Sequence, residues 1–418
     1  MQVDGQDHGQ VLCFSQRVDP SPNINPTTRF LRAIAYRLAA ISLYLHRHNL
    51  RSPVRRPGLA AIPVWVPKDR IKQHALFTLD PLTDTRWPVF IGSHPAASVC
   101  HTIGWLRALQ RTYDYRPIVF TPSSPDDELR SGVVFCQIDS WLTGRRIVSL
   151  PFSDHCEPLA CSPEELAALM GGVMEEFRRR RYRRVEVRPL ATLCAGSGLE
   201  KSQEFVFHRL DLQDGRDRVF RRLHKDCVQR KIRRAEREGL TWEDGHSAEL
   251  LGQFYRLLVI SRRRQELPPQ PLDWFRNLMD CLGDQLNIGV ASKDRQPIAA
   301  IMTLRFKDVL TYKYGCSDRR FHRFGGMQLL LWKAIEQAIS NGLREFDMGR
   351  SDLDSPGLIT FKDRWAAARS RLTYWACPAG CATASQPGWK LNVAKTIFSH
   401  APKTCLTLLG NLIYKHIG

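Results

Sequence analysis

Apolar residues recur every three or four positions between residues 327 and 339, a spacing that predicts a helix with one buried face. The apolar set comprises Met327, Leu330, Leu331, Ala334, Ile335, Ala338 and Ile339. Gly325 and Gly326 stand just before this helix and Gly342 follows it, as is common at helix ends. A glycine pair at a helix start lets backbone N–H groups face an anion, which the helix dipole also favours. The stretch therefore predicts a site for a negatively charged group.

Strands are predicted on both sides of this helix, one from Tyr312 and one over 344–349. The second strand ends in a polar cluster of Asp347, Arg350, Ser351 and Asp352. Gly357 and an apolar pair then lead to Phe361 and Lys362 on a short helix. Strand ends that bring glycine and polar residues into one region are where α/β proteins place ligands.

The rest of the chain alternates between strand and helix patterns. In the first half we predict helices over 98–113 and 162–181 and strands over 117–120, 131–141, 146–150 and 184–189. In the second half we predict a strand over 204–212, one long basic helix over 219–238, helices near 248–264 and 271–283, a strand over 286–291 and a hairpin over 298–315. Strand–helix alternation with several antiparallel neighbours predicts an α/β or α+β mixed sheet.

The two ends of the chain differ from this pattern. A basic amphipathic helix is predicted from Thr28, and a second amphipathic helix ends the chain. Either helix can lie on an anionic membrane or pack on the protein itself. We therefore divide the chain into an N-terminal extension (1–67), two lobes (68–203 and 204–378) and a C-terminal amphipathic tail (379–418).

The chain is strongly basic, with 61 Lys and Arg against 42 Asp and Glu and a formal net charge of +19. Such a charge indicates anionic partners: phosphate-bearing donors, nucleic acid or an anionic membrane surface. The 12 cysteines lack the paired ligand spacing of a zinc site, so no metal is expected. The first ten residues lack a signal-peptide pattern and no apolar run reaches about 18 residues, so we expect a cytoplasmic protein, with peripheral contact at the inner membrane face left open.

Several motifs together resemble the FemABX-like transferases of the GNAT acyltransferase superfamily. They are Leu150-Pro151-Phe152-Ser153-Asp154-His155, Arg230-Lys231-Ile232-Arg233-Arg234-Ala235, Arg262-Arg263-Arg264 with Leu267-Pro268-Pro269-Gln270-Pro271, Tyr312-Lys313-Tyr314-Gly315-Cys316-Ser317, Leu331-Trp332 with Ala338 and Gly342, Phe346-Asp347-Met348-Gly349-Arg350, and Gly357-Leu358 with Phe361-Lys362. The likeness covers roughly residues 85 to 378 and is nearest to the FemAB-like branch found with exopolysaccharide systems. It implies two GNAT-like lobes and transfer of an acyl or aminoacyl group.

The chemistry of acyl transfer requires a held donor, an acceptor that loses its proton, and a stabilised oxyanion. Lys362 is the first catalytic candidate, because its ammonium can face an oxyanion or a donor phosphate, a role that the resemblance also implies. Asp347 and Asp352 are candidates for accepting the acceptor's proton. We place substrate contacts at Tyr314, Ser317, Arg350 and His155, with His155 also a candidate base, and at Arg230 and Arg234, which are four apart on one helix face.

The identity of the donor stays open between two classes. Acyl-CoA is favoured, with Arg323, Gly325 and Gly326 as the phosphate-binding residues. The coenzyme A loop of ordinary GNAT enzymes has a glycine where Arg323 stands, which is a departure from that pattern. The alternative donor is aminoacyl-tRNA, although no segment is long enough for the coiled-coil arm of many tRNA-dependent relatives.

The acceptor is expected to be an amine or hydroxyl of an anionic or lipid-linked saccharide, as in cell-envelope or exopolysaccharide precursors. A third hypothesis is a non-catalytic protein that binds membrane or nucleic acid through its basic helices.

Overall fold

The computed structural model describes residues 76–379, except 142, 192 and 194–196, together with 414–416. The predicted helix from Thr28 lies outside the described residues, and so does most of the predicted C-terminal helix. The described residues all fall within one compact unit, Arg70–Gly418.

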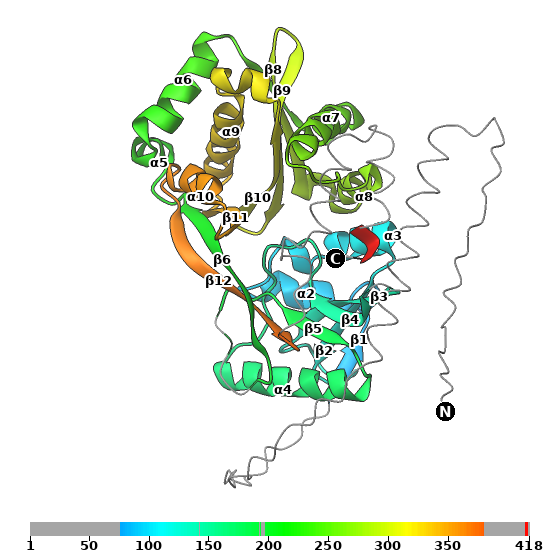
Figure 1. Cartoon of the computed structure of the whole chain (residues 1–418). Helices are drawn as coiled ribbons and strands as arrows, with labels where there is room; N and C mark the ends of the chain where they lie inside the picture. Colours follow the sequence, from blue (N-terminus) through cyan, green and yellow to red (C-terminus); the bar gives the residue numbers. More distant parts are fainter. Residues whose placement is uncertain (1–75, 142, 192, 194–196, 380–413, 417–418) are drawn as a thin grey trace, which may run out of the picture. The chain divides into compact units, whose positions relative to one another are not determined.

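The first half of this unit follows the predicted order of strands and helices (Figure 1). Its elements are β1 (Phe77–Leu79), α2 (Arg86–Ser93), the short 3₁₀ segment η1 (Val99–His101), α3 (Ile103–Tyr113), β2 (Arg116–Thr121), β3 (Val133–Ser140), β4 (Gly144–Ser149), α4 (Pro163–Arg179) and β5 (Arg184–Val187). The predicted start of α4 is confirmed, because the Ser162 hydroxyl accepts the Glu165 N–H at 3.1 Å. The predicted helix over 98–113 is wrong at its start, where Thr102 ends η1 and caps α3.

The second half again alternates strands with helices. Its elements are β6 (Glu200–Asp211), α5 (Arg216–Arg222), the π-helical segment η2 (Lys225–Gln229), α6 (Arg230–Arg237), β7 (Thr241–Gly245), α7 (Ala248–Arg264), α8 (Leu272–Leu282), η3 (Gly283–Gln285), β8 (Leu286–Lys293), β9 (Gln296–Phe306), β10 (Val309–Ser317), η4 (Arg319–Phe324), α9 (Gly326–Ser340), β11 (Glu345–Asp352), α10 (Pro356–Asp363) and β12 (Ala368–Cys377).

The single long helix predicted over 219–238 is wrong. Leu223 has extended backbone angles and ends α5, so α5 and α6 are separate helices. The His224 imidazole then accepts the N–H groups of Asp226 and Cys227 at 3.2 and 3.3 Å, as a capping side chain does. Spacing of apolar residues did not reveal this break, because the pattern continues in phase across it.

One 12-stranded mixed sheet runs through both halves, in the order β1-β2-β3-β4-β5-β12-β6-β11-β10-β9-β8-β7. The last strand in sequence, β12, joins the halves, since it pairs antiparallel with β5 on one side and β6 on the other. The pairs β4–β5 and β10–β11 are parallel, and the remaining neighbours are antiparallel. The predicted mixed α/β fold is confirmed.

Helices cover both faces of the sheet (Figure 1). Along β9, Ala299 and Ile301 pack in the cluster that contains α9, whereas Ala300, Met302 and Leu304 pack in the cluster that contains α7 and α8. This alternation is the period of two that a strand buried on both faces shows. The latter cluster also holds α3 of the first half, where Trp105 meets Trp274 of α8 edge to face at 5.4 Å.

Candidate active site

Two neighbouring parallel strands, β10 and β11, separate in the middle of the sheet. Their described pairing runs from Val309–Glu345 to Thr311–Asp347, although β10 continues to Ser317 and β11 to Asp352. On β10 the ladder to β9 is irregular between Tyr312 and Tyr314, and on β11 the ladder to β6 is irregular between Asp347 and Arg350. Irregularities of this kind bend a strand and re-aim its side chains. The divergence therefore opens the sheet at the carboxyl ends of two parallel strands, where α/β folds place ligands.

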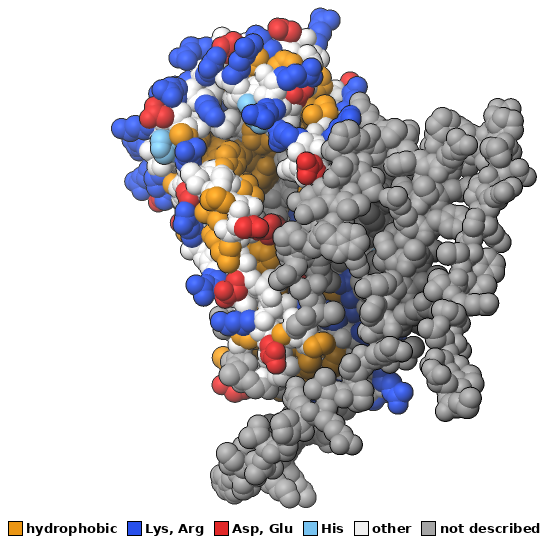
Figure 2. All heavy atoms as spheres, viewed as in Figure 1, with side chains coloured by type: hydrophobic (Ala, Val, Ile, Leu, Met, Phe, Trp, Pro, Cys, Tyr) orange, Lys and Arg blue, Asp and Glu red, His pale blue; other side chains and the backbone are white. Residues whose placement is uncertain are grey.

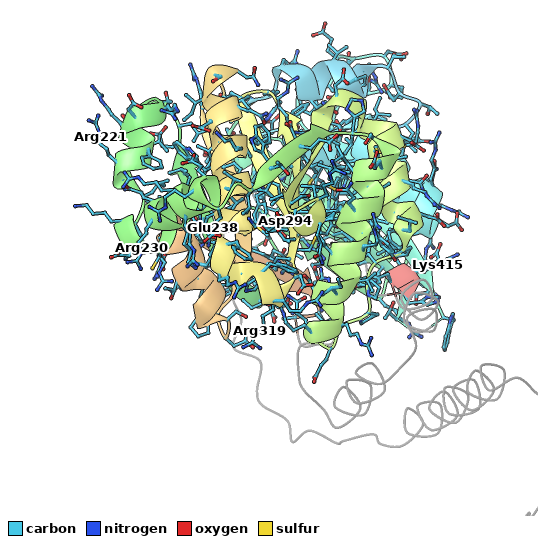
Figure 3. The ribbon with its side chains drawn as sticks, turned by 90° about the horizontal axis from the view of Figure 1, so that it is seen from above. Arg221, Arg230, Glu238, Asp294, Arg319 and Lys415 are labelled. Atoms are coloured by element: carbon cyan, nitrogen blue, oxygen red, sulfur yellow. The ribbon has the colours of Figure 1, made fainter. Side chains whose placement is uncertain are left out.

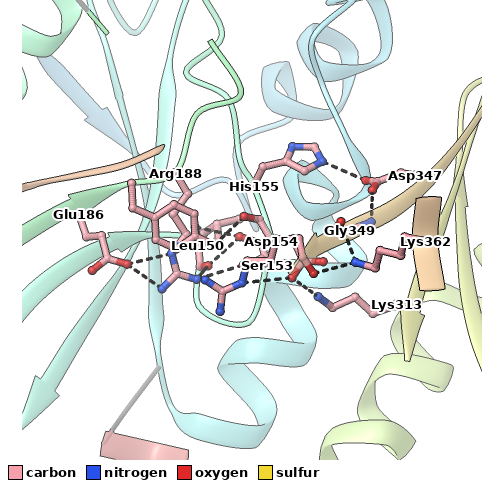
Figure 4. A network of polar contacts seen from close by, with 12 residues as sticks. Leu150, Ser153, Asp154, His155, Glu186, Arg188, Lys313, Asp347, Gly349 and Lys362 are labelled. Carbon is pink, nitrogen blue, oxygen red and sulfur yellow. Dashed lines mark hydrogen bonds and ion pairs between the residues drawn. The ribbon is translucent and has the colours of Figure 1, made fainter. Parts of the chain in front are cut away.

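A loop of the first half enters this opening. After β4 the chain carries Asp154, whose carboxylate lies 3.6 Å from Lys313 Nζ of β10 and 3.8 Å from Arg350 Nε of β11 (Figure 4). Tyr374 of β12 donates its hydroxyl to the Asp154 carbonyl at 2.6 Å. Burial opposes ionisation of Asp154, but Lys313, Arg350 and other nearby cations outweigh it and lower the pKa of that carboxyl. The loop is thus held by charges on both separating strands.

Gly349 makes this insertion possible. Its φ of +71° lies in the left-handed region, and a Cβ at this position would collide with Asp154 Oδ2. Only glycine combines that conformation with so close an approach of the loop.

A second support of the loop comes from Arg188, which follows β5. Its guanidinium donates to the carbonyls of Leu150 and Ser153 at 2.7 and 3.2 Å, and Glu186 holds it at 2.8 Å (Figure 4). Buried charges need such pairing to be tolerated. The first half therefore presents Asp154 on a braced loop.

Lys362 lies on α10 and is buried, with only 3% of its surface exposed. Its ammonium donates to the carbonyls of Gly349 and Arg350 at 2.9 and 2.8 Å. Burial lowers the pKa of Lys362 to about 8, although the Asp154 and Asp347 carboxylates oppose the shift. An ammonium has three N–H donors, so one remains for another acceptor.

His155, next to Asp154, reaches Asp347 on β11. The distance from His155 Nε2 to Asp347 Oδ2 is 3.1 Å, and the other Asp347 oxygen accepts the Gly349 N–H at 2.7 Å (Figure 4). Burial acts against a charge on His155, but the hydrogen bond and charge of Asp347 outweigh burial and raise the pKa of the imidazole.

Beside the opening, at the start of α9, lies a cavity of about 250 Å³. It is lined by Lys231, Ile298, Ala299, Ser317, Phe321, His322, Gly326, Met327, Gln328 and Phe361. In Figure 2 an apolar hollow on the upper half of the molecule has Lys and Arg side chains above it and to its left. A Cβ added to Gly325 would lie 2.6 Å from the Lys231 carbonyl oxygen, and one added to Gly326 would lie 3.2 Å from the Ile298 side chain. The glycine pair thus lets the α9 start approach α6 and β9 closely.

A larger open cavity of about 650 Å³ adjoins the first, since Lys231 and His322 line both. Its walls carry five cationic and two anionic side chains, namely Arg230, Lys231, Arg234, Arg237 and Arg323 with Asp226 and Glu238. Arg230 and Arg234 lie 3.3 and 3.4 Å from those carboxylates, which leaves an excess of three positive charges. Figure 3 shows Arg221, Arg230 and Arg319 at the outer edge of this half. We call the seven charged residues that line this cavity, together with His322, the basic groove.

The structure distributes the predicted site residues over three places. His155, Asp347, Arg350 and Lys362 meet in one network, Ser317 and Gly326 line the smaller cavity, and Arg230, Arg234 and Arg323 line the basic groove. Gly325 caps α9 beside Gly326. Tyr314 is packed inward, where its hydroxyl accepts the Trp274 indole N–H at 2.9 Å. Asp352 is exposed at the end of β11, outside the network.

Sequence reasoning did not select Asp154 and Lys313, which lie at the centre of the network. Lys313 stands between two tyrosines and is the one charged residue of β10, and a charge there is a signal of buried pairing. Asp154 had no such signal beyond its position next to His155.

Comparison with known proteins gives one family match and several similar structures. Residues 222–362 match the family model of the acetyltransferase (GNAT) domain. No curated protein matches the chain. The crystal structure of FemX is similar with a TM-score of 0.57 and 14% identity, covering 71% of this chain and 96% of FemX.

Two further structures are similar at lower scores. A tandem GNAT protein from the clavulanic acid biosynthesis pathway has a TM-score of 0.47 and 12% identity, covering 74% of this chain and 99% of its own. L-PGS from Bacillus licheniformis has a TM-score of 0.43 and 14% identity, with 70% and 90% covered. Scores this low do not establish a shared fold by themselves. Residues 222–362 thus match a GNAT acetyltransferase domain, and the likeness to FemX shows a shared fold. The prediction of a GNAT-like acyltransferase is supported by this domain match.

Among the described residues, no helix combines the length and apolar character that crossing a bilayer requires.

Proposed function

We propose that this enzyme transfers an acyl group from acyl-CoA to an amine or hydroxyl of a cell-envelope or exopolysaccharide precursor. The observation that carries the proposal is the opening between β10 and β11, where the buried Lys362 donates to two β11 carbonyls. A cavity lined by Gly326 at the start of α9 and by Phe361, the neighbour of Lys362, adjoins it. A donor whose phosphates bind at that helix start can extend its thioester into the opening.

The donor side is assigned to the smaller cavity and the start of α9. The N–H groups after Gly325 and Gly326 and the dipole of a 15-residue helix suit a diphosphate, and Lys231 adds a positive charge. Arg320 is not needed there, because it forms a two-pronged ion pair with Asp318. The apolar part of the cavity, including Phe361, suits an uncharged chain.

The start of α4 in the first half does not suit an anion. The Ser162 hydroxyl already accepts the Glu165 N–H, and Glu164 and Glu165 place negative charge in the first turn. We therefore assign one donor site to each chain, in the second half.

The chemical step is assigned to the network at the opening. Attack on the donor carbonyl places negative charge on its oxygen, which the remaining N–H of Lys362 is proposed to stabilise. Lys313 is left out of the regular ladder at the β10 irregularity, so its backbone N–H is a second candidate donor. Asp154 and Gly349 set the position of both groups.

Aminoacyl-tRNA is the second candidate donor, because the basic groove offers an excess of three positive charges beside the donor cavity. A polyanion larger than coenzyme A would use this surface. The same groove suits an anionic lipid-linked acceptor or an anionic membrane surface as a partner.

The deciding experiment combines binding and turnover. Purified protein is heated with acetyl-CoA, palmitoyl-CoA or alanyl-tRNA, since a donor that binds only the folded state raises the melting temperature. Thiol release is then followed with glucosamine as the probe acceptor. Stabilisation by an acyl-CoA together with acceptor-dependent thiol release supports the proposal. Ribonuclease-sensitive transfer without thiol release supports the tRNA alternative instead.

Replacement of Lys231 with glutamine tests the donor assignment. Loss of one charge-assisted hydrogen bond corresponds to roughly tenfold weaker donor binding. Lys333→Gln is the matched control, because Lys333 is paired with Glu336 on the same helix and lines neither cavity. Equal donor affinity in both variants would contradict the assignment.

A further inference from the structure

His155 and Asp347 form a pair that neither half of the protein contains alone. His155 lies on the loop after β4, and Asp347 is the last residue of β11 that pairs with β10. The two residues are 192 positions apart in the sequence and 3.1 Å apart in the structure. The pair therefore exists only when the first-half loop occupies the opening.

The position of the Asp347 side chain is fixed by contacts other than its contact with His155. One of its oxygens accepts the Gly349 N–H at 2.7 Å, and its side chain is only 4% exposed. Gly349 is itself confined by Asp154, as described above. The oxygen that faces His155 is thus held by the backbone of β11.

The other ring nitrogen of His155, Nδ1, indicates what this residue does. Nδ1 is buried and has no hydrogen-bond partner among the described residues. A buried polar atom without a partner costs about 1–3 kcal/mol, so its presence in the network calls for an explanation. When Nε2 carries the proton and donates it to Asp347, Nδ1 holds a lone pair and is able to accept a proton.

We propose that His155 is the general base of the acyl transfer and that Asp347 is its positioning residue. The inference rests on the proposed function. As the acceptor oxygen or nitrogen forms its bond to the donor carbonyl carbon, its proton passes to His155 Nδ1. The carbon–sulfur bond then breaks, and the thiolate leaves and takes the proton back from the imidazolium. No other reactant is needed, and the base returns to its starting form.

The surroundings of His155 favour proton uptake. Facing it are Asp347 and Glu345 of β11, Asp154 and Glu157 of its own loop, His101 of η1 and the apolar ring of Phe207 of β6. The carboxylates stabilise an imidazolium, whereas Phe207 and burial oppose it. With the raised pKa of His155, turnover should fall on the acid side at a pH above the ordinary histidine value of 6.5.

The test measures kcat/KM against pH with acetyl-CoA and glucosamine for the wild type, His155→Gln, Asp347→Asn and the double variant. His155→Gln should lower kcat/KM about 10²–10⁴-fold and abolish the acid limb. In Asp347→Asn the amide oxygen still accepts the Gly349 N–H and its NH₂ group faces Nε2. That amide forces the proton onto Nδ1, so a similar loss is expected, and the double variant should be no worse than either single one. His246→Gln, at an exposed histidine, is the matched control and should not change the profile.

Two further measurements distinguish loss of the fold from loss of the general base. Each variant is checked for its melting temperature and for acetyl-CoA binding, so that loss of the fold is recognised. Nitrogen NMR of labelled histidine reports the neutral tautomer of His155, and protonated Nδ1 in the wild type would overturn the proposal even without turnover. An active His155→Gln variant that keeps its acid limb would also overturn it. Absence of thiol release in the wild type with every donor and acceptor would instead overturn the proposed function.

Discussion

The close approach of Gly349 to Asp154 makes a quantitative prediction about stability. In Gly349→Ala the new residue must adopt a φ of +71°, and its Cβ collides with Asp154 Oδ2. The left-handed conformation costs about 1–2 kcal/mol for a residue with a Cβ. Forced overpacking adds about 1–3 kcal/mol. We therefore expect a loss of about 2–5 kcal/mol in the free energy of unfolding.

Gly342 provides a matched control on the same half of the protein. Its φ is +73°, nearly that of Gly349, but no atom lies within 4 Å of an added Cβ. Gly342→Ala should therefore lose only the conformational part, about 1 kcal/mol after the gain from a stiffer unfolded chain. The difference between the two variants measures the contact with Asp154 alone.

The assay is urea unfolding of wild type and both variants, followed by tryptophan fluorescence. Turnover should fall further in Gly349→Ala, since a displaced Asp154 alters its ion pairs with Lys313 and Arg350 and moves the neighbouring His155. An equal loss of stability in Gly349→Ala and Gly342→Ala would refute the view that β11 is built to receive the first-half loop.

Further predictions address Lys362, the basic groove and the start of α4. The pKa of Lys362 is lowered from 10.5 to about 8, so between pH 8 and pH 10.5 the unfolded chain binds one proton more than the folded protein. The free energy of unfolding of the wild type, relative to that of Lys362→Met, should therefore rise with pH across this window, as measured by urea unfolding. If charged Lys362 assists catalysis, turnover should fall as pH rises through about 8, and Lys362→Arg should lose this alkaline limb. Replacing Arg234 and Arg237 with glutamine should weaken tRNA binding and flatten its salt dependence, measured by fluorescence titration at several salt concentrations. Ser162→Ala should cost about 1 kcal/mol of stability through loss of its cap, with donor affinity unchanged, in a urea titration and a thermal-shift assay.

A different result would contradict the predictions for Lys362→Met, for the arginine changes and for Ser162→Ala. A pH-independent difference between wild type and Lys362→Met would mean that this lysine titrates normally. A salt slope unaffected by the arginine changes would place polyanion binding elsewhere on the chain. Loss of donor affinity in Ser162→Ala would point to a second donor site in the first half.

The spacing of apolar residues and the residues typical of helix ends predicted most of the helices and strands around the site. The helix after Gly325 and Gly326, the strand that ends near Arg350 and the short helix with Lys362 all lie where the pattern predicted them. The break at Leu223 was missed, because helical spacing carries no information about a turn that preserves its phase. The role of Asp352 as a proton acceptor stays a prediction, and its exposure outside the network does not favour it.

The amino-acid sequence by itself determined the local structures, the excess of positive charge and the glycines that permit close approach, since each depends on residues near one another in the chain. Only the tertiary structure decided that Asp154 and His155 of the first half lie against Lys313, Asp347 and Gly349 of the second. The physical reason is that β12 joins the two half-sheets and the separation of β10 from β11 leaves a space. A charged loop can occupy that space only when opposite charges from a distant part of the chain stabilise it there.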